Sequence, residues 1–246
     1  MRSRLWAAVL LGLLFSSAVK AQLYQVVTEE WAPYNYRENG RLTGMSTEIV
    51  QAIMALTGDR FEITMLPSMR ASYVLRTRPR MIMYSMFRTP EREALYKWVG
   101  PVVEESIHAY QRGGMPQIDS LAQLRRAERI TTRSDGLIPD TLQAMGLSNL
   151  DKSATDNLQL YRMLMAGRTD IIVGDTDAGV AYYSRQLNMP VGTLRRIPVE
   201  LYRASLYIAF SLDCDDSLVD DWRHALEQLR ATGELARIQQ RYEQLP

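Results

Sequence analysis

The sequence predicts an α/β fold made of two lobes. Short apolar segments that are typical of strands alternate with helical segments, this alternating series occurs twice, and no Pro/Gly-rich linker separates the two series. Strands that alternate with helices form parallel sheets through right-handed crossovers. We therefore expect two lobes, each a mainly parallel sheet flanked by helices, which are joined by two hinge strands.

The first series contains three expected strands and two expected helices. The strands cover residues 23–28, 61–66 and 81–85, and the helices cover residues 46–56 and 68–75. Ser46 is the expected N-cap of the first helix, and Gly58 is its expected stop. Ile49, Ile53 and Leu56 recur at helical spacing, so we expect all three to be buried.

The second series repeats this pattern and ends in helices. We expect strands at residues 106–110, 129–132, 169–173 and 205–211, and helices at residues 139–145, 157–166 and 178–187. Ser217 is expected to cap a long helix, which Thr232 and Gly233 end before a final helix begins. Apolar residues recur on one face of both C-terminal helices, so we expect them to pack on a core.

The N-terminus is organised like a signal peptide. Arg2 and Arg4 form a basic start, residues 5–15 are apolar, and small residues precede Ala21. The apolar run is shorter than the about 20 residues that a helix needs to cross a bilayer. We expect cleavage near Ala21 and a periplasmic location for the mature chain, in which no later segment is apolar for long enough to cross a membrane.

Composition argues against several function classes. The formal net charge is +1, and about −2 remains once the three cationic residues of the signal peptide are removed. No basic tract remains, so we expect no nucleic-acid partner. Cys214 is the only cysteine, and His108 and His224 are the only histidines. An intrachain disulfide is therefore excluded, and we expect no metal site, no cofactor and no Ser-His-Asp triad.

Three segments lie where expected strands end and the chain turns. They are Thr28-Glu-Glu-Trp-Ala-Pro-Tyr34 followed by Gly40-Arg-Leu-Thr-Gly44, then Ser85-Met-Phe-Arg-Thr-Pro-Glu-Arg92, and finally Ala166-Gly-Arg-Thr-Asp170 running on to Gly174-Asp175. Together with the C-terminal stretch 225–238, they resemble the family 3 extracellular solute-binding proteins of ABC-type amino-acid uptake systems. The resemblance implies a periplasmic-binding-protein type II clamp and a monomer. In this clamp, lobe 1 would comprise residues 22–104 and 207–246, and lobe 2 residues 105–206.

The resemblance also implies which residues bind the two charged ends of an amino acid. Arg92, the Arg of the Thr-x-x-Arg motif, would bind the α-carboxylate, and Asp175 would bind the α-ammonium. Thr89 and Pro90 favour a helix start just before Arg92, where the helix dipole and a guanidinium would both attract a carboxylate. The alternatives are that Arg92 is solvated and that the nearby Asp177 replaces Asp175. Asp170 is expected to be structural.

Four further residues belong to the expected ligand site. The resemblance makes Trp31 an aromatic platform for the ligand's side chain, although it could instead only pack its lobe. Ser85 can donate through its hydroxyl or its backbone. Arg70 follows the second strand and faces either the cleft or the solvent. Ser134 lies in the turn after residue 133, where hydroxyl and N–H groups can bind a carboxylate.

Phe87, Arg88 and Arg133 depart from the family pattern. A bulky ring stands at position 87 where a small hydroxyl residue is common, and two additional arginines stand near the expected site. Together with Arg70 and Arg92, these arginines leave open a pocket for a more anionic ligand.

The leading functional hypothesis is a secreted solute-binding protein, not an enzyme. It would close on a small, amino-acid-like ligand and present it to the membrane permease of an ABC importer. One alternative is a ligand-sensing module for a separate membrane receptor. Another is a periplasmic dehydratase-like enzyme acting on a small carboxylic acid, with Glu29, Glu30 or Asp175 as general acid.

Overall fold

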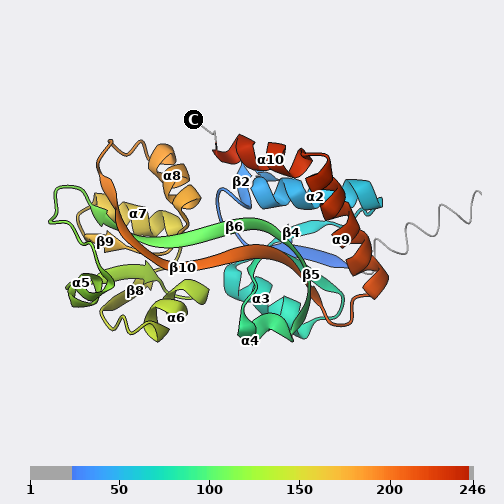
Figure 1. The fold of residues 1–246 in the computed structure, drawn as a ribbon, viewed down its shortest axis with the longest axis horizontal. Coiled ribbons are helices and arrows are strands. Elements are labelled where there is room, and N and C mark those ends of the chain that lie inside the picture. Colours follow the sequence, from blue (N-terminus) through green and yellow to red (C-terminus); the bar gives the residue numbers. More distant parts are fainter. Residues whose placement is uncertain (1–23, 244–246) are drawn as a thin grey trace, which may run out of the picture. The chain divides into compact units, whose positions relative to one another are not determined.

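The computed structural model describes residues 24–243, and the predicted signal peptide lies outside them. The chain forms two compact units. Unit 1 comprises residues 24–30, 34–103 and 206–242, and unit 2 is formed mainly by residues 31–33 and 104–205. Two long strands, β6 (Tyr96–Arg112) and β10 (Leu194–Ser211), each run from one unit into the other (Figure 1). Both units contain sheets flanked by helices, so the predicted α/β fold class is confirmed.

In unit 1, four strands lie in the order β4-β1-β5-β10. The strand β1 (Gln25–Thr28) is parallel to β4 (Ile63–Met65) and to β5 (Met81–Phe87), whereas β5 is antiparallel to β10. All seven residues of β5 are buried, as expected for a central strand that is covered on both faces. The carboxyl ends of β1 and β5 therefore lie at the same edge of the sheet.

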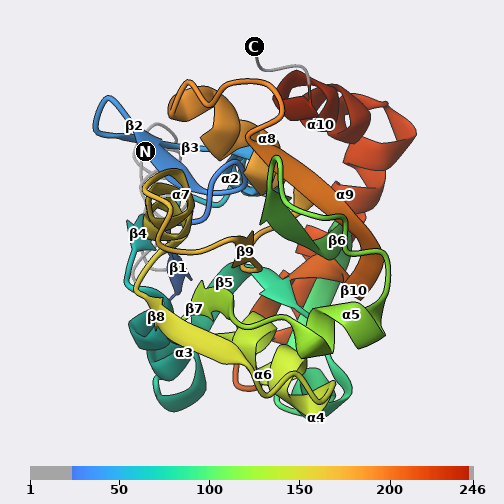
Figure 2. The same ribbon diagram turned by 90° about the vertical axis from the view of Figure 1, so that its left-hand side faces the viewer.

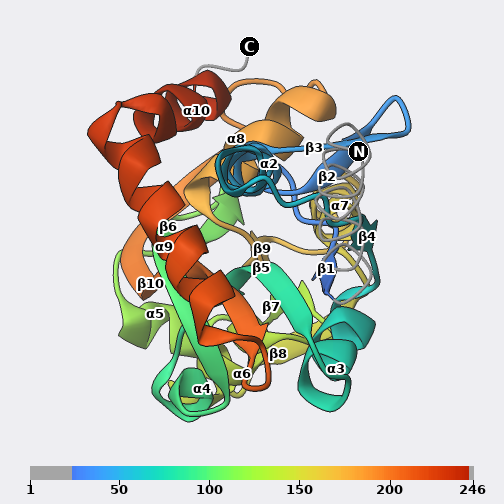
Figure 3. The ribbon, with the colours of Figure 1, turned by 90° about the vertical axis from the view of Figure 1, so that its right-hand side faces the viewer.

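Helices cover both faces of this sheet. The helix α2 (Met45–Thr57) lies on one face beside α9 (Asp216–Ala231), and α3 (Ser68–Thr77) covers the other face (Figures 1 and 3). The last helix, α10 (Glu234–Glu243), follows α9 after a break at Gly233. The side chain of Trp222 anchors α9, because it packs against Phe61 and Phe210 and donates a 2.8 Å hydrogen bond to Asp59.

Unit 1 also contains a two-stranded hairpin and a single-turn helix. The hairpin pairs β2 (Tyr36–Glu38) with β3 (Arg41–Thr43). It leads into α2 through Gly44, where φ is +119° and an added Cβ would lie 2.3 Å from the carbonyl oxygen of Tyr34. Only glycine fits such a position without strain. The single-turn helix α4 (Pro90–Glu93) follows β5, with Thr89 as N-cap and Pro90 at its first position, as the sequence predicts.

In unit 2, four strands lie in the order β6-β9-β7-β8. The short strand β9 (Ile171–Ile172) is antiparallel to β6 and parallel to β7 (Ile130–Arg133), which is in turn parallel to β8 (Leu150–Ala154). Figure 2 shows α6 (Leu137–Ala144) and α7 (Asn157–Met165) on opposite faces of these strands. The helices α5 (Leu121–Arg126) and α8 (Asp177–Gln186) complete the unit.

Two helix caps differ from the prediction. The helix α2 begins after Gly44, and Ser46 lies inside the helix with its side chain fully buried. The helix α9 begins after Asp215, not Ser217, and the Asp215 carboxylate accepts a hydrogen bond from Tyr24. In both cases a serine near a helix start satisfies the local capping rule, but the structure places the N-cap two residues earlier.

The extent of burial and of some strands also differs from the sequence prediction. Leu56 is 44 % exposed although it continues the spacing of Ile49 and Ile53, because the last turn of α2 extends beyond the core. Both long strands extend well beyond the predicted segments. The hairpin β2–β3, the helix α5 and the strand β8 were not predicted as elements, because each is short and mostly polar. No helix in the described part of the chain is long and apolar enough to span a bilayer.

Candidate ligand-binding site

A buried carboxylate lies at the end of strand β9. Asp175 follows Val173 and Gly174 and is only 3 % exposed. Its Oδ1 accepts hydrogen bonds from the indole Nε1–H of Trp31 (3.1 Å) and from its neighbour Thr176 N–H (3.0 Å). Its Oδ2 accepts the hydroxyl of Tyr161 (3.1 Å). Thus three neutral donors surround a group that is an anion in water.

These donors do not compensate fully for the loss of solvent. Burial raises the pKa of Asp175 to about 7, although the hydrogen bonds from Trp31, Thr176 and Tyr161 and the charge of Arg133 all lower it. A carboxylate in this state gains stability when a cation approaches it. The two oxygens together have about four acceptor directions, of which the three donors use three. The arrangement can therefore bind one more donor, and a positively charged donor would gain the most.

Two glycines allow the close packing around this carboxylate. A Cβ added to Gly179 of α8 would lie 1.9 Å from Asp175 Oδ1, and one added to Gly174 would lie 2.4 Å from Leu160 Cδ1. Asp175 thus packs directly against the first turn of α8, which Thr176 caps by accepting a hydrogen bond from the Gly179 N–H (3.0 Å). The sequence pattern predicted Asp175 but not Gly179.

Trp31 belongs to unit 2 although the residues before and after the segment 31–33 belong to unit 1. Its side chain is buried and its N–H group is directed at Asp175. The structure therefore brings together two of the residues predicted for the site. The contact gives Trp31 a polar role beside the predicted one, because its N–H group helps to hold the carboxylate in place.

A buried polar atom close to Gly174, the neighbour of Asp175, has no hydrogen-bond partner within the described part of the chain. It is the side-chain Oδ1 of Asn157. Asn157 is the first residue of α7, and its Oδ1 would lie 3.9 Å from a Cβ built on Gly174. A buried acceptor without a partner costs free energy unless a ligand or water pairs with it. Sequence reasoning missed Asn157, and its position at a helix start gave no distinguishing signal.

Ser134 lies in the turn that follows β7, and its side chain is exposed. Its backbone N–H donates to the Ala154 carbonyl oxygen (2.7 Å), so this N–H is not available to a ligand carboxylate, whereas the hydroxyl can still donate. Arg133, one residue earlier, forms a 3.6 Å ion pair with Asp135 and contributes its charge near Asp175. Of these two neighbours, Arg133 is the one that acts on the buried carboxylate.

Asp177 and Asp170, the two other acids near this segment of the chain, each form an ion pair with an arginine. Asp177 contacts His108 (3.0 Å), the hydroxyl of Tyr110 (2.7 Å) and Arg196 (2.9 Å). Partial burial raises the pKa of Asp177, but the hydrogen bonds from Tyr110 and Arg196 outweigh this effect, so its pKa lies below the usual value. Asp170 pairs with Arg112 at 2.6 Å. Asp175 is the acid whose environment favours an additional cation.

Ser85 is buried in unit 1 near the end of β5. Its φ is +63°, which is uncommon for a residue with a side chain. Its hydroxyl donates to Asn35 Oδ1, and Asn35 Nδ2 donates to the Glu29 carbonyl oxygen. The hydroxyl hydrogen is therefore used within the unit, and its oxygen still has acceptor capacity.

Arg92 lies in α4, where its Nη1 donates to the carbonyl oxygen of Phe87 (3.3 Å). A guanidinium has five N–H donors, and this hydrogen bond uses one of them, so the others can donate to a ligand. Arg70 is exposed on α3. Arg88, one of the arginines that suggested an anionic pocket, forms two hydrogen bonds with Glu93 instead. No group of three or more His, Cys, Asp or Glu in residues 24–243 is arranged to hold a metal ion.

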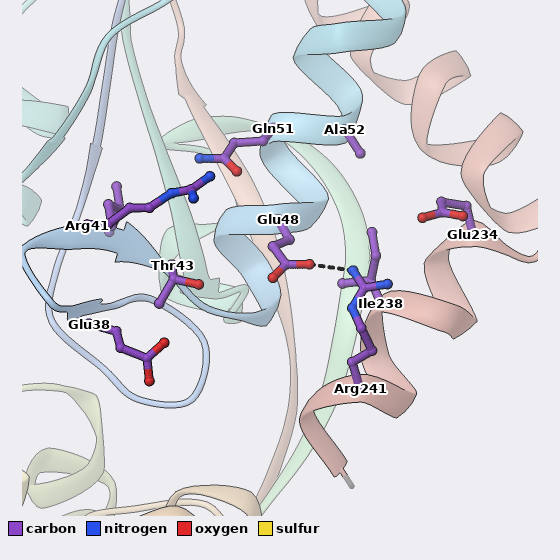
Figure 4. A pocket seen from close by; sticks show the side chains of 10 residues that line it. Glu38, Arg41, Thr43, Glu48, Gln51, Ala52, Glu234, Ile238 and Arg241 are labelled. Atoms are coloured by element: carbon purple, nitrogen blue, oxygen red, sulfur yellow. Dashed lines mark hydrogen bonds and ion pairs between the residues drawn. The ribbon is translucent and has the colours of Figure 1, made fainter. Parts of the chain in front are cut away.

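A separate pocket of about 430 Å³ lies within unit 1, between the hairpin β2–β3, α2 and α10 (Figure 4). At its centre, Glu48 pairs with Arg241 and accepts the hydroxyl of Tyr242, both from α10. Tyr242 OH also accepts the backbone N–H of Gly44 (3.2 Å). The polar groups of this pocket thus fasten the last helix to α2, which is a structural role.

The sequence matches a protein-family model over most of its length. The model of the bacterial extracellular solute-binding proteins, family 3, matches residues 24–244. The chain belongs to this family. The predicted resemblance is therefore confirmed.

Solved structures show the same fold at low sequence identity. A histidine kinase sensor domain with similarity to periplasmic binding proteins has a TM-score of 0.79 at 20 % identity, covering 89 % of this chain and 95 % of that one. An ancestral arginine-binding protein bound to arginine has a TM-score of 0.76 at 19 % identity, covering 90 % and 99 %.

The arginine-, lysine-, histidine-binding protein ArtJ from Geobacillus stearothermophilus has a TM-score of 0.74 at 18 % identity, covering 89 % of this chain and 94 % of that one. None of the curated proteins compared matches the chain. At these identities the likeness shows the fold, a type II periplasmic binding protein, and the ligand must be argued from the site.

Proposed function

We propose that this family member is a periplasmic solute-binding protein for a small ligand with a positively charged amino group. The observation that carries the proposal is Asp175, a buried carboxylate with a pKa of about 7 that three neutral donors hold in a fixed orientation. A ligand ammonium would supply a positive charge at the Asp175 carboxylate. The three groups that donate hydrogen bonds to this carboxylate could stay in place.

The proposal extends to both ends of an amino acid. Arg92 retains free N–H groups, so it supports the sequence expectation that it binds the α-carboxylate of the same ligand. Trp31 offers a buried ring beside Asp175, and we propose that this ring also contacts the ligand's side chain. Ser85, Arg70 and Ser134 remain proposed contacts, of which Ser85 is buried and the other two are exposed.

We propose that the loaded protein presents its ligand to the permease of an ABC importer. The alternative is a sensory role, in which the same fold reports its ligand to a separate membrane receptor. The likeness to a histidine kinase sensor domain favours keeping this alternative. A pull-down with the ligand-loaded protein from solubilised membranes separates the two, since a permease and a receptor kinase differ in sequence and size.

A thermal-shift screen of residues 22–246 tests the ligand proposal. The panel comprises the L-amino acids, polyamines and small organic acids, including those without an amino group. A ligand at about 100 times its dissociation constant should stabilise the folded state by about 2.7 kcal/mol. We expect hits among compounds with an ammonium group, and Asp175→Asn should lose them. Hits restricted to acids without an amino group would contradict the proposal.

The same panel tests whether the protein is an enzyme. Chromatography after a long incubation should recover each bound compound unchanged. Consumption of a carboxylic acid would instead support the dehydratase-like alternative.

A further inference from the structure

Arg88 takes part in an unusual set of contacts next to the segment that carries Arg92. Its Nε donates to Glu93 Oε2 at 2.6 Å, and its Nη2 donates to Glu93 Oε1, so the guanidinium and the carboxylate form a bidentate pair. An arginine–carboxylate pair of this kind is more directional than a lysine–carboxylate pair, because the guanidinium and the carboxylate are both planar and rigid. The pair links the two ends of residues 88–93 in unit 1.

The same guanidinium lies over two aromatic rings. Its central carbon is 5.9 Å from the ring centre of Trp98 and 5.2 Å from that of Tyr207. These two rings meet edge to face, with centres 6.0 Å apart. Cations within about 6 Å of an aromatic face are attracted to it. The ion pair with Glu93 holds the edge of the Arg88 guanidinium, and the two rings restrict its movement further.

Two further contacts complete the set. Trp98 Nε1–H donates to the backbone carbonyl oxygen of Glu93 (3.2 Å), so the residue that pairs with Arg88 is held through its backbone as well. Gly100 has a φ of +148°, and an added Cβ would lie 2.6 Å from the ring of Tyr207. The absence of a side chain at position 100 thus lets the Tyr207 ring occupy its place.

Arg92 lies between the two ends of this cross-linked segment. Its backbone N–H donates to the Thr89 carbonyl oxygen (3.0 Å), and its Nη1 donates to the Phe87 carbonyl oxygen. A helix of one turn such as α4 has little stability of its own, because helix nucleation is unfavourable. The turn therefore depends on contacts beyond its own backbone hydrogen bonds, and the pair between Arg88 and Glu93 spans it.

We infer that Arg88 is a positioning residue for Arg92: its pair with Glu93, stacked on Trp98 and Tyr207, fixes the turn from which Arg92 binds the ligand's carboxylate. This inference rests on the proposed function, since it assigns Arg88 an effect on binding through Arg92. An exposed ion pair adds little to overall stability. The expected consequence of losing Arg88 is therefore weaker recognition of the carboxylate, with little loss of fold.

The experiment compares each amino acid that binds the wild-type chain with its carboxamide, which lacks the carboxylate charge. Calorimetry gives the dissociation constants of both for the wild type, Arg88→Ala, Arg88→Lys and Glu93→Gln. Arg223→Ala is the matched control, because Arg223 forms a comparable exposed ion pair with Asp220 in the same unit. Melting temperatures show that each variant is folded.

We expect Arg88→Ala and Glu93→Gln to weaken binding of the amino acid about tenfold, because a weakened hydrogen bond between charged groups costs roughly this factor in affinity. Binding of the carboxamide should change by less than about twofold, because its lost charge has already weakened the contact with Arg92. Arg88→Lys keeps the charge but not the planar fork, so it should fall between the wild type and Arg88→Ala. Arg223→Ala should bind both compounds as the wild type does.

Three results would overturn the inference. Equal losses for the amino acid and its carboxamide would show that Arg88 supports only the fold of unit 1. Unchanged affinity in all the Arg88 and Glu93 variants would show that Arg92 needs no such support. If the wild type binds no amino acid at all, the proposed function fails and the inference falls with it.

Discussion

Two opposing effects act on the carboxyl group of Asp175: burial disfavours its charged form, and hydrogen bonds favour it. The fold removes its carboxyl group from water, and this desolvation raises its pKa from the ordinary value of 3.8 to about 7. The hydrogen bonds from Trp31 and Tyr161 hold the group in one orientation. The protein therefore keeps this proposed binding group in place at a cost in stability, and perturbed groups of this kind are common at functional sites.

The stability of the folded state should reveal this cost. A carboxyl group whose pKa is raised on folding contributes stability below its unfolded pKa and loses it as the pH rises through the folded pKa. Between pH 5 and the folded pKa of about 7, the wild type should lose roughly 2–3 kcal/mol relative to Asp175→Asn, at about 1.4 kcal/mol per pH unit, with little further loss up to about pH 8. Urea denaturation at both pH values measures this difference. Parallel pH profiles for the two proteins would show that Asp175 ionises as it does in water.

Ligand affinity should depend on pH in the opposite direction. A ligand ammonium binds the ionised carboxylate, so below pH 7 it must displace a proton from Asp175. Affinity should therefore fall about tenfold per pH unit below 7 and level off above it. Titrations of one ligand hit at about pH 5.5, 6.5 and 8 measure this dependence. A flat profile would indicate that another group binds the amine.

The carboxylate of Asp175 packs against the helix α8. Its first turn approaches Asp175 so closely that position 179 has no room for a side chain. The helix is also capped by Thr176, the residue next to Asp175, which links the position of the acid to the start of the helix. The geometry of the proposed site is thus built into the junction between β9 and α8.

Gly179→Ala tests this packing. Helix propensity alone would favour alanine by about 1 kcal/mol. We expect the variant instead to lose about 1–3 kcal/mol in the free energy of unfolding, since the new methyl group must displace the carboxylate. Ligand binding should be lost as well. Ala181→Gly, on an exposed position of the same helix, measures the propensity effect alone. A stabilised Gly179→Ala protein would show that the junction can rearrange.

The C-terminal helix depends on one buried hydroxyl. Tyr242 donates to Glu48 and accepts from the backbone of Gly44, and burial together with the Glu48 contact raises the pKa of Tyr242 to about 12. Tyr242→Phe leaves the Gly44 N–H unpaired and removes one of the contacts of Glu48, which keeps its pair with Arg241, and it should lower the free energy of unfolding by about 1–2 kcal/mol.

Arg241→Ala is the matched control for Tyr242→Phe. It removes an exposed ion pair to the same Glu48 and should cost less than about 1 kcal/mol. Chemical denaturation measures both. Equal effects would show that the charge of Glu48, not the buried hydroxyl, holds α10.

At the scale of the whole molecule, the family match covers residues 24–244, which begin just after the predicted signal peptide. If residues 1–21 direct export, the protein in a periplasmic extract should begin at Gln22. Intact mass measurement of that fraction tests the prediction. Ala21→Lys replaces the small residue at the cleavage position and should leave the longer chain uncleaved. Recovery of the full-length chain in the cytoplasmic fraction would contradict the assignment.

Much of the fold is readable from local patterns in the sequence. The alternation of apolar and helical segments indicated the α/β class, and Gly58, Thr89-Pro90 and Thr232-Gly233 marked helix boundaries where the structure has them. Short motifs at strand ends gave the family and pointed to Asp175. These features depend on neighbouring residues along the chain, which is why one sequence suffices to find them.

The three-dimensional fold decided what surrounds those residues. Tyr161 and Gly179 reach Asp175 only because α7 and α8 pack against the end of β9, and Trp31 meets it across 144 positions of sequence. The sequence could place Arg88 near Arg92 but not over two rings, one of which lies more than a hundred residues away. Such contacts follow from packing between distant segments, and the pKa of a buried group follows from the solvent that this packing excludes.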